Sequence, residues 1–261
     1  MRNVFITTIA AMAFAGAATA AELGGSVGLE VTENSAGDYV AETTLGLGVS
    51  AETGVGVAFG GFAFESVDGG NLEVDEWQLG VTTTAGTFSF GDQGDLFVEN
   101  DFETVGGTTL ADPAEGDSLI ADFGNAAVMV GFTDITADVT DVENVQGSYT
   151  ASVATVNVTA VVDYNFNAED FVLGTKATTT FNSLNVGGLL TYDNGTEAVG
   201  YEASANYRAV TAFVNGADSD AFQNVGAAVT HGFNGANLYA EGSYNVDTEE
   251  FTPAFGVAFN F

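Results

Sequence analysis

Residues 22–32, ELGGSVGLEVT, alternate between apolar and polar side chains with a period of two. An extended strand with this sequence would place Leu23, Val27, Leu29 and Val31 on one face and Glu22, Ser26, Glu30 and Thr32 on the other. The same alternation recurs in residues 38–50 and in short segments to the end of the chain. Because side chains of a strand point to opposite faces in turn, the sequence predicts an all-β fold.

The number of alternating segments predicts a transmembrane antiparallel β-barrel of 16 strands. Fourteen strands remain an alternative, because the assignments near 86–123 and 208–216 are less clear. Sixteen strands leave about 15 residues for each strand and its connection, enough for the roughly 10 residues that cross a bilayer obliquely. Short uncharged turns such as 85–86 and 154–155 alternate with acidic connections such as 247–250. An exported soluble sandwich is disfavoured, because the polar faces lack the large apolar residues of a packed core.

The N-terminus predicts export. Residues 1–20 combine Arg2, an apolar stretch over 6–18 and the small residues Ala18-Thr19-Ala20, which together are typical of a cleaved signal peptide. Residues 21–261 are then a single barrel domain. No apolar stretch reaches the roughly 20 residues that a membrane-spanning helix needs.

The charge balance restricts the partners and the chemistry. The chain has 36 Asp and Glu, 3 Lys and Arg, and a formal net charge of −33. Such a chain repels nucleic acid and attracts cations. It has no Cys, which excludes zinc-thiolate sites and thiol catalysis.

Residues 93–117, QGDLFVENDFETVGGTTLADPAEGD, form the one long interruption of the strand pattern. Apolar residues such as Leu96 and Phe97 accompany its acids, so we expect the loop to fold into the barrel and narrow the pore. A solvated surface loop is the alternative. The candidate constriction residues are Asp95, Glu99, Asp101, Glu103, Asp112, Glu115 and Asp117. Asp95, Asp101 and Glu103 are candidate Ca²⁺ ligands, although no calcium-loop spacing is present.

Two segments resemble bacterial outer-membrane barrels. Residues 251–261, FTPAFGVAFNF, alternate aromatic residues and end on Phe261, which resembles the terminal strand that the barrel-assembly machinery of Gram-negative bacteria recognises. Residues 86–95, GTFSFGDQGD, followed by the long loop and Ser118-Leu119-Ile120, resemble the fifth strand, inward-folded third external loop and sixth strand of general porins, the alphaproteobacterial type above all. The resemblance implies an outer-membrane homotrimer that contacts lipid and lipopolysaccharide and passes small hydrophilic solutes.

The chain departs from that family in its charges. The resemblance implies acidic residues on the third loop that face a basic cluster on the wall, and this sequence has no such cluster. By strand parity, the residues expected on the lumen wall are Glu30, Glu42, Glu76, Asp163, Glu202 and the single cation Lys176. We therefore expect a water-filled, cation-selective pore for ions and small solutes.

Three other functions are alternatives to such a pore. A structural or adhesive barrel could use the acidic surface loops to bind divalent cations. A sugar channel would need a row of inward aromatic residues, which the pattern does not supply. A phospholipase would need a Ser-His pair, yet the only histidine, His231, lacks the His-x-Ser arrangement. We expect no enzymatic activity.

Overall fold

The computed structural model describes residues 21–33, 39–67, 70–93, 95–99, 117–133, 142–217, 223–233 and 236–260. Sixteen strands and one short helix lie in these ranges, which confirms the prediction of 16 strands and not 14. The predicted signal peptide, residues 1–20, lies outside them. The elements are β1 (Ala21–Glu33), β2 (Tyr39–Thr53), β3 (Gly56–Val67), β4 (Glu73–Thr82), β5 (Thr87–Asp92), α1 (Leu96–Glu99), β6 (Asp117–Asp122), β7 (Ala126–Phe132), β8 (Val142–Val153), β9 (Val156–Asn165), β10 (Asp170–Phe181), β11 (Leu184–Asp193), β12 (Ala198–Tyr207), β13 (Val210–Ala217), β14 (Asn224–Phe233), β15 (Ala236–Asn245) and β16 (Glu250–Asn260).

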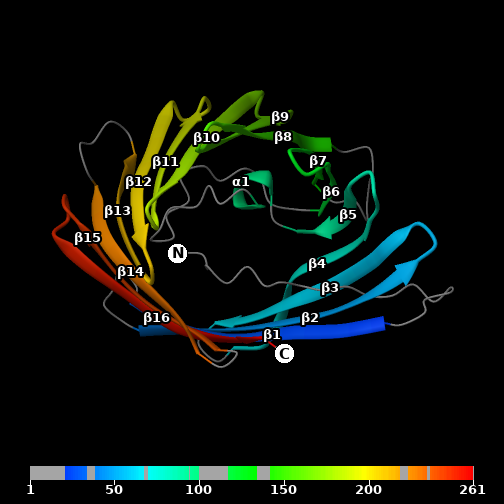
Figure 1. Cartoon of the computed structure of the whole chain (residues 1–261), viewed down its shortest axis with the longest axis horizontal. Coiled ribbons are helices and arrows are strands. Elements are labelled where there is room, and N and C mark those ends of the chain that lie inside the picture. Colours follow the sequence, from blue (N-terminus) through cyan, green and yellow to red (C-terminus); the bar gives the residue numbers. More distant parts are fainter. Residues whose placement is uncertain are drawn as a thin grey trace.

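The strands form a closed antiparallel barrel (Figure 1). Each strand pairs with its neighbours in sequence, and β16 pairs with β1 through partners that run from Ser26–Asn260 to Thr32–Ala254. Because the barrel is closed, no strand lies at a sheet edge, and each strand hydrogen-bonds through its backbone to a neighbour on both sides. No helix in the described part of the chain is long and apolar enough to span a bilayer.

Because the sequence alternates with a period of two, each strand has one face outside the barrel and one face toward the lumen. Large apolar side chains are exposed on the outward positions, for example Leu29, Leu173 and Phe255. Residues opposite one another in the register share a face, so Glu30 and its partner Glu42 both lie on the other side of the sheet. The outward face is therefore apolar, as in barrels that stand in lipid.

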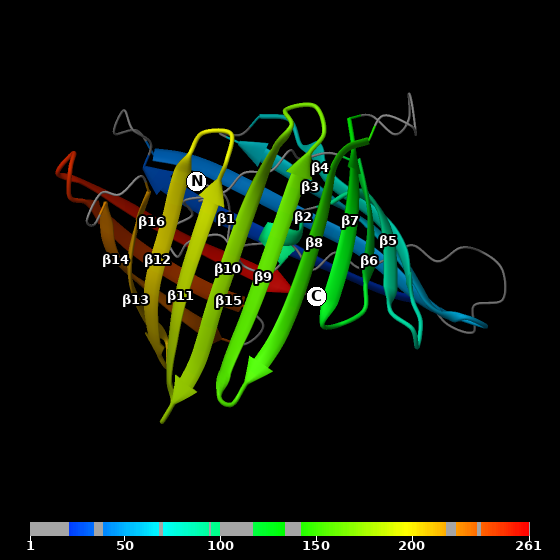
Figure 2. The same cartoon turned by 90° about the horizontal axis from the view of Figure 1, so that it is seen from above.

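The connections differ between the two ends of the barrel (Figure 2). At one end several turns are two-residue connections, such as 154–155, 182–183 and 208–209. At the other end, three connections of four residues, 166–169, 194–197 and 246–249, follow Asn165, Asp193 and Asn245. Oδ1 of each of these residues accepts backbone N–H groups two and three positions later. Such Asx turns stabilise a tight reversal of the chain through hydrogen bonds between residues of the turn alone.

Several aromatic rings lie over glycines of the neighbouring strand. On the inward face these pairs are Phe59 with Gly80, Phe213 with Gly226, and Tyr239 with Gly256. A Cβ added at Gly80 would come within 2.5 Å of Phe59 Cζ and 2.6 Å of the Phe88 carbonyl oxygen. The glycine thus makes room for the ring beside it.

Candidate functional site: the lumen and its inner helix

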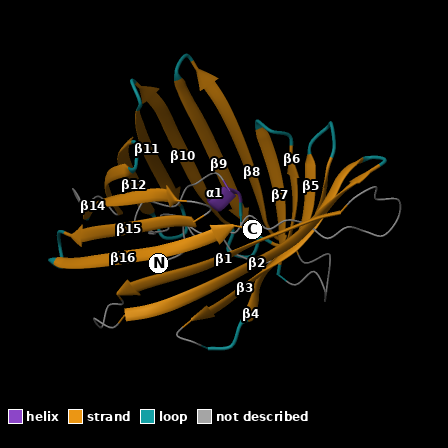
Figure 3. Cartoon of the chain, turned by 60° about the horizontal axis from the view of Figure 1, so that its bottom comes forward, coloured by secondary structure: helices purple, strands orange, loops and turns teal. Residues whose placement is uncertain are grey.

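The helix α1 lies inside the ring of strands, against β7 and β8 (Figures 1 and 3). Leu96 and Phe97 are 0% and 1% exposed. They join an apolar cluster whose other members come from β6, β7, β9, β10 and β11: Ile120, Ala127, Met129, Val161, Val172 and Leu189. These wall residues define the inward face of their strands. Leu96 and Phe97, two of the apolar residues expected to anchor the long loop, are therefore packed against the inner wall.

Two hydrogen bonds fix the start of α1. Oδ1 of Asp95 accepts the backbone N–H of Phe97 at 2.7 Å, which is the arrangement of a helix N-cap. The backbone N–H of Leu96 donates to Oε1 of Gln146 on β8, also at 2.7 Å. The second bond joins residues 50 positions apart and connects the helix directly to the wall.

A buried polar group lies beside the apolar cluster. Gln146 is opposite both Met129 and Asp163 in the register, so all three share the inward face. Nδ2 of Asn144 donates to Oδ1 of Asp163 at 2.7 Å. All three polar side chains are buried. This part of the wall therefore combines an apolar seat for α1 with polar groups that bond to one another and to the helix.

The charged side chains on the remaining inward face are mostly acidic. Followed from strand to strand, the register places carboxylates inward on most strands, among them Glu30, Glu42, Glu65, Glu76, Asp163, Glu202 and Glu241. Among the described residues, the Lys and Arg are Lys176 and Arg208. Lys176 is inward on β10, between Thr159 and Leu189, and Arg208 is in the turn after β12, with its guanidinium 5.1 Å from the centre of the Tyr207 ring.

The acids and the lysine are on different parts of the ring. Glu30, Glu42, Glu65 and Glu76 are on the consecutive strands β1 to β4. Lys176 is on β10, eight strands from β2 in a ring of 16. The part of the wall formed by β1 to β4 is thus acidic in this chain.

The seven predicted constriction acids have different positions. Asp95 is buried and caps α1. Glu99 is in α1, and Asp117 begins β6 opposite Asp92, on the outward side of the alternation. Asp101, Glu103, Asp112 and Glu115 lie outside the described residues, so their role in the constriction stays a prediction, as does calcium binding at Asp95, Asp101 and Glu103. Within the described ranges, no three or more acidic or histidine side chains are grouped to hold a metal ion.

Sequence reasoning missed several inward residues. Glu65, Glu241, Asn144 and Gln146 were not singled out, although parity along their strands places each of them inward. The apolar patch that receives α1 was also missed, since the inward face was expected to carry small polar residues. The sequence does contain a signal for this patch, because inward positions of five strands carry large apolar residues: Ile120, Met129, Val161, Val172 and Leu189.

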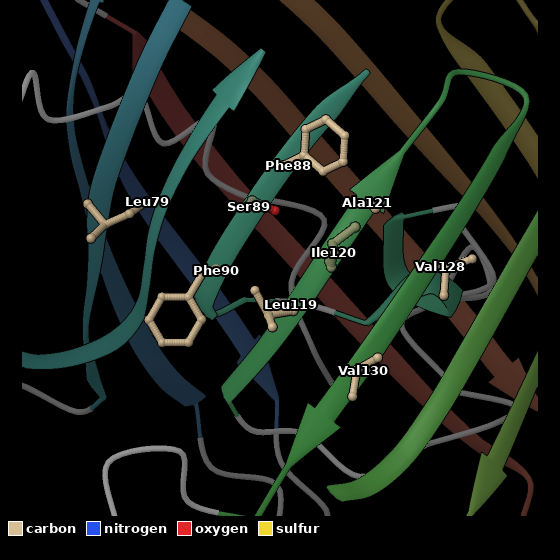
Figure 4. A pocket seen from close by; sticks show the side chains of 9 residues that line it. All are labelled: Leu79, Phe88, Ser89, Phe90, Leu119, Ile120, Ala121, Val128 and Val130. Atoms are coloured by element: carbon tan, nitrogen blue, oxygen red, sulfur yellow. The ribbon is translucent and has the colours of Figure 1, made fainter. Parts of the chain in front are cut away.

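A groove on the opposite, outward face differs in character (Figure 4). It crosses β4 to β7 and is lined mainly by outward apolar residues such as Phe88, Leu119 and Val128. It therefore belongs to the outer face of the barrel and not to the lumen.

Comparison with solved structures identifies the architecture. A variant of the Rh. blastica porin matches with a TM-score of 0.66 and 14% sequence identity, covering 93% of this chain and 100% of that one. The chain has the porin fold. A loop-deletion variant of OmpT, an outer membrane protein of Vibrio cholerae, matches the porin-fold chain with a TM-score of 0.65 and 16% identity over 93% and 99% of the two chains.

The porin fold also occurs with a stated selectivity. An anion-selective porin from Comamonas acidovorans matches with a TM-score of 0.60 and 12% identity, over 93% of this chain and 99% of that one. No protein-family model and no curated protein sequence matches this chain. At these identities the shared property is the porin fold, and the inward residues have to be interpreted from this chain itself.

Proposed function

We propose that this chain is an outer-membrane porin that lets ions and small hydrophilic solutes diffuse through a water-filled, acidic, cation-preferring lumen. The observation that carries the proposal is a closed barrel, apolar outside, whose inward face bears a series of carboxylates. A polar lumen holds water, while the apolar outer face meets lipid. The fold is shared with outer-membrane porins.

The sign of the inward charge supports the preference for cations. Rings and stripes of carboxylates raise the local concentration of cations and exclude anions. Among the described residues, the inward carboxylates, which include Glu30, Glu42 and Glu202, far outnumber the one inward lysine. The porin fold is also found in a protein described as anion-selective, so the inward side chains and not the fold determine the sign.

The long loop is proposed to narrow the lumen. Its described start, residues 95–97, is packed on the inner wall. A loop that begins inside the barrel is well placed to continue there, and its acids would then add to the negative field. Deleting residues 100–112 should raise conductance and admit larger solutes.

A homotrimer is proposed on two grounds. OmpT of Vibrio cholerae, which has the same fold, is described in a trimer form. In addition, β5 and β6 have only six residues each. At about 3.4 Å per residue and a tilt of about 40°, such strands rise only about 15 Å, less than the roughly 25 Å apolar band of a barrel in lipid. A neighbouring copy would cover this low wall better than a bilayer. Mass measurement in detergent tests the trimer.

Reversal potentials in planar bilayers test the proposed function. With a salt gradient, the wild type should give a potential of the sign expected for cation transfer. Glu30→Gln combined with Glu42→Gln should reduce it, whereas Glu169→Gln, in an exposed turn, should leave it near the wild-type value. Preference for anions, or the absence of conductance, would contradict the proposal. The second of these results would favour a structural or adhesive barrel.

A further inference from the structure

Gln146 is the wall residue whose side chain bonds to the backbone of α1. We infer that Gln146 is a positioning residue for the pore: its side chain holds α1 against the wall and thereby sets the open cross-section of the lumen. The inference rests on the proposed porin function for its conductance readout, and on the geometry alone for the position of the helix.

The hydrogen bond fixes both the place and the direction of α1. Oε1 of Gln146 accepts the N–H of Leu96, the first residue of the helix. The first N–H groups of a helix have no partner within the helix, so an acceptor on the wall satisfies a donor that burial would otherwise leave unpaired. Asp95 satisfies the N–H of Phe97 in the same turn. The wall and the cap together therefore hold the start of the helix.

The apolar contacts and the hydrogen bond have different roles. Leu96 and Phe97 are buried against wall residues that include Met129 and Val172. Apolar burial is non-directional, so it holds α1 near the wall without fixing its register. The hydrogen bond is directional and selects one position of the helix on this patch.

Gln146→Leu can test the position of α1 only if the variant barrel still folds, and this depends on the surroundings of Nε2 of Gln146. Nε2 is buried and makes no hydrogen bond of ordinary geometry among the described residues, although it lies near the Asp163 carboxylate. Asp163 keeps its hydrogen bond from Asn144 when Gln146 is replaced. Leucine has a volume similar to that of glutamine. The barrel of Gln146→Leu should therefore still fold, while α1 loses its acceptor.

The first experiment compares two variants in which an amide side chain is replaced by leucine, Gln146→Leu and Asn185→Leu. Gln146→Leu should lower single-channel conductance by about 1.5-fold or more, because a helix that leaves the wall enters the water-filled section and narrows it, and it should slow the uptake of larger sugars in liposome swelling. Asn185→Leu is the control, since Asn185 is on β11 and accepts a bond from Thr180 instead of one from α1. Its conductance should match the wild type. Conductance of Gln146→Leu equal to or above that of the wild type would overturn the inference while leaving the proposed function intact.

A second pair of variants removes the donor instead of the acceptor. Leu96→Pro lacks the N–H, and proline is tolerated at the first position of a helix. Leu96→Ala keeps the N–H, and both variants lose the leucine side chain. Leu96→Pro should conduct less than Leu96→Ala. Equal values, or a higher value for Leu96→Pro, would show that the bond does not set the cross-section.

Fluorescence reports the position of α1 without any need for conduction. The chain has one tryptophan, Trp77, so Trp77→Phe with Phe97→Trp places the only indole on the helix. Its emission should be blue-shifted, as expected for a buried ring, and should move to longer wavelength when Gln146→Leu is added. Unchanged emission would overturn the inference even if the wild-type protein did not conduct. A non-conducting wild type with the expected shift would contradict only the proposed function.

Discussion

Asn144 donates a hydrogen bond of 2.7 Å from Nδ2 to Oδ1 of Asp163, across the inward face of β8 and β9. Asp163 is only 2% exposed. Gly131, opposite Asn144 in the register, leaves the space that the amide occupies, because a Cβ there would overlap Asn144 Oδ1. A buried carboxylate needs such donors, since burial removes the water that would otherwise solvate it.

Asn144→Leu should lower the free energy of unfolding by about 1.5–3 kcal/mol, the usual contribution of a hydrogen bond to a charged group. Urea unfolding in lipid vesicles measures this difference. Ser152→Ala is the control, because its hydroxyl bonds to Asn157 at an exposed site near a turn, and it should change the value by less than about 0.5 kcal/mol. Equal losses in both variants would contradict the role given to Asn144.

Gly80→Ala should destabilise the barrel by about 1–3 kcal/mol, because the new methyl group would press on the Phe59 ring and the Phe88 carbonyl. Gly54→Ala offers the comparison, since a Cβ at Gly54 meets nothing within 4 Å. Thermal unfolding in detergent can compare the two. The expectation fails if both variants unfold at the wild-type temperature.

Leu173→Lys should cost about 2–4 kcal/mol, the range for a cationic side chain near the middle of the lipid-facing surface. Leu173 is 43% exposed on the outward face of β10. Thr178→Lys puts the same residue on the inward face of the same strand and should cost far less. Refolding titrations into vesicles measure both. A larger loss for Thr178→Lys would reverse the assignment of the two faces.

Lys176→Gln should strengthen the preference for cations, because it removes the inward cation of the described residues and leaves their carboxylates. The reversal potential in a salt gradient should increase in magnitude with the same sign. Thr178→Gln, two residues along the same face, serves as the control for a change of volume. A fall in the potential would indicate that Lys176 does not oppose cation passage.

Raising the salt concentration from 0.1 M to 1 M should weaken the cation preference, because the screening length falls from about 10 Å to about 3 Å. The measurement is a series of reversal potentials at a fixed concentration ratio. Glu30→Gln with Glu42→Gln should show a smaller dependence on salt than the wild type. A preference that does not depend on salt would require a source other than these fixed charges.

Most of the barrel was predictable because its rules are local. The alternation in residues 22–32 and the parity that predicts Glu76 on the lumen wall depend only on neighbours in sequence, and the register agrees with both assignments. The turns were equally accessible, since Asn165 and Asn245 bond to N–H groups two and three residues away. Strand number followed from the same pattern.

The contacts of the lumen were less predictable because they join distant segments. The bond between Leu96 and Gln146 spans 50 residues, and nothing near either residue specifies the other. The register shift between Ala63 and Phe64 changes which residues at the end of β3 and at the start of β4 face each other, and it leaves no local signal in the alternation. The inward aromatic residues Phe59 and Phe213 were missed for a related reason, since their partners Gly80 and Gly226 are on neighbouring strands.

The pairing of inward rings with glycines also bears on how the channel can evolve. Phe59, Phe213 and Tyr239 each occupy the space over a glycine that has no side chain of its own. A larger residue at Gly80, Gly226 or Gly256 would displace the neighbouring ring, and a ring turned toward the centre would narrow the barrel. A single codon change at one of these glycines would then alter the width of the channel, although every charged residue on its wall stayed the same.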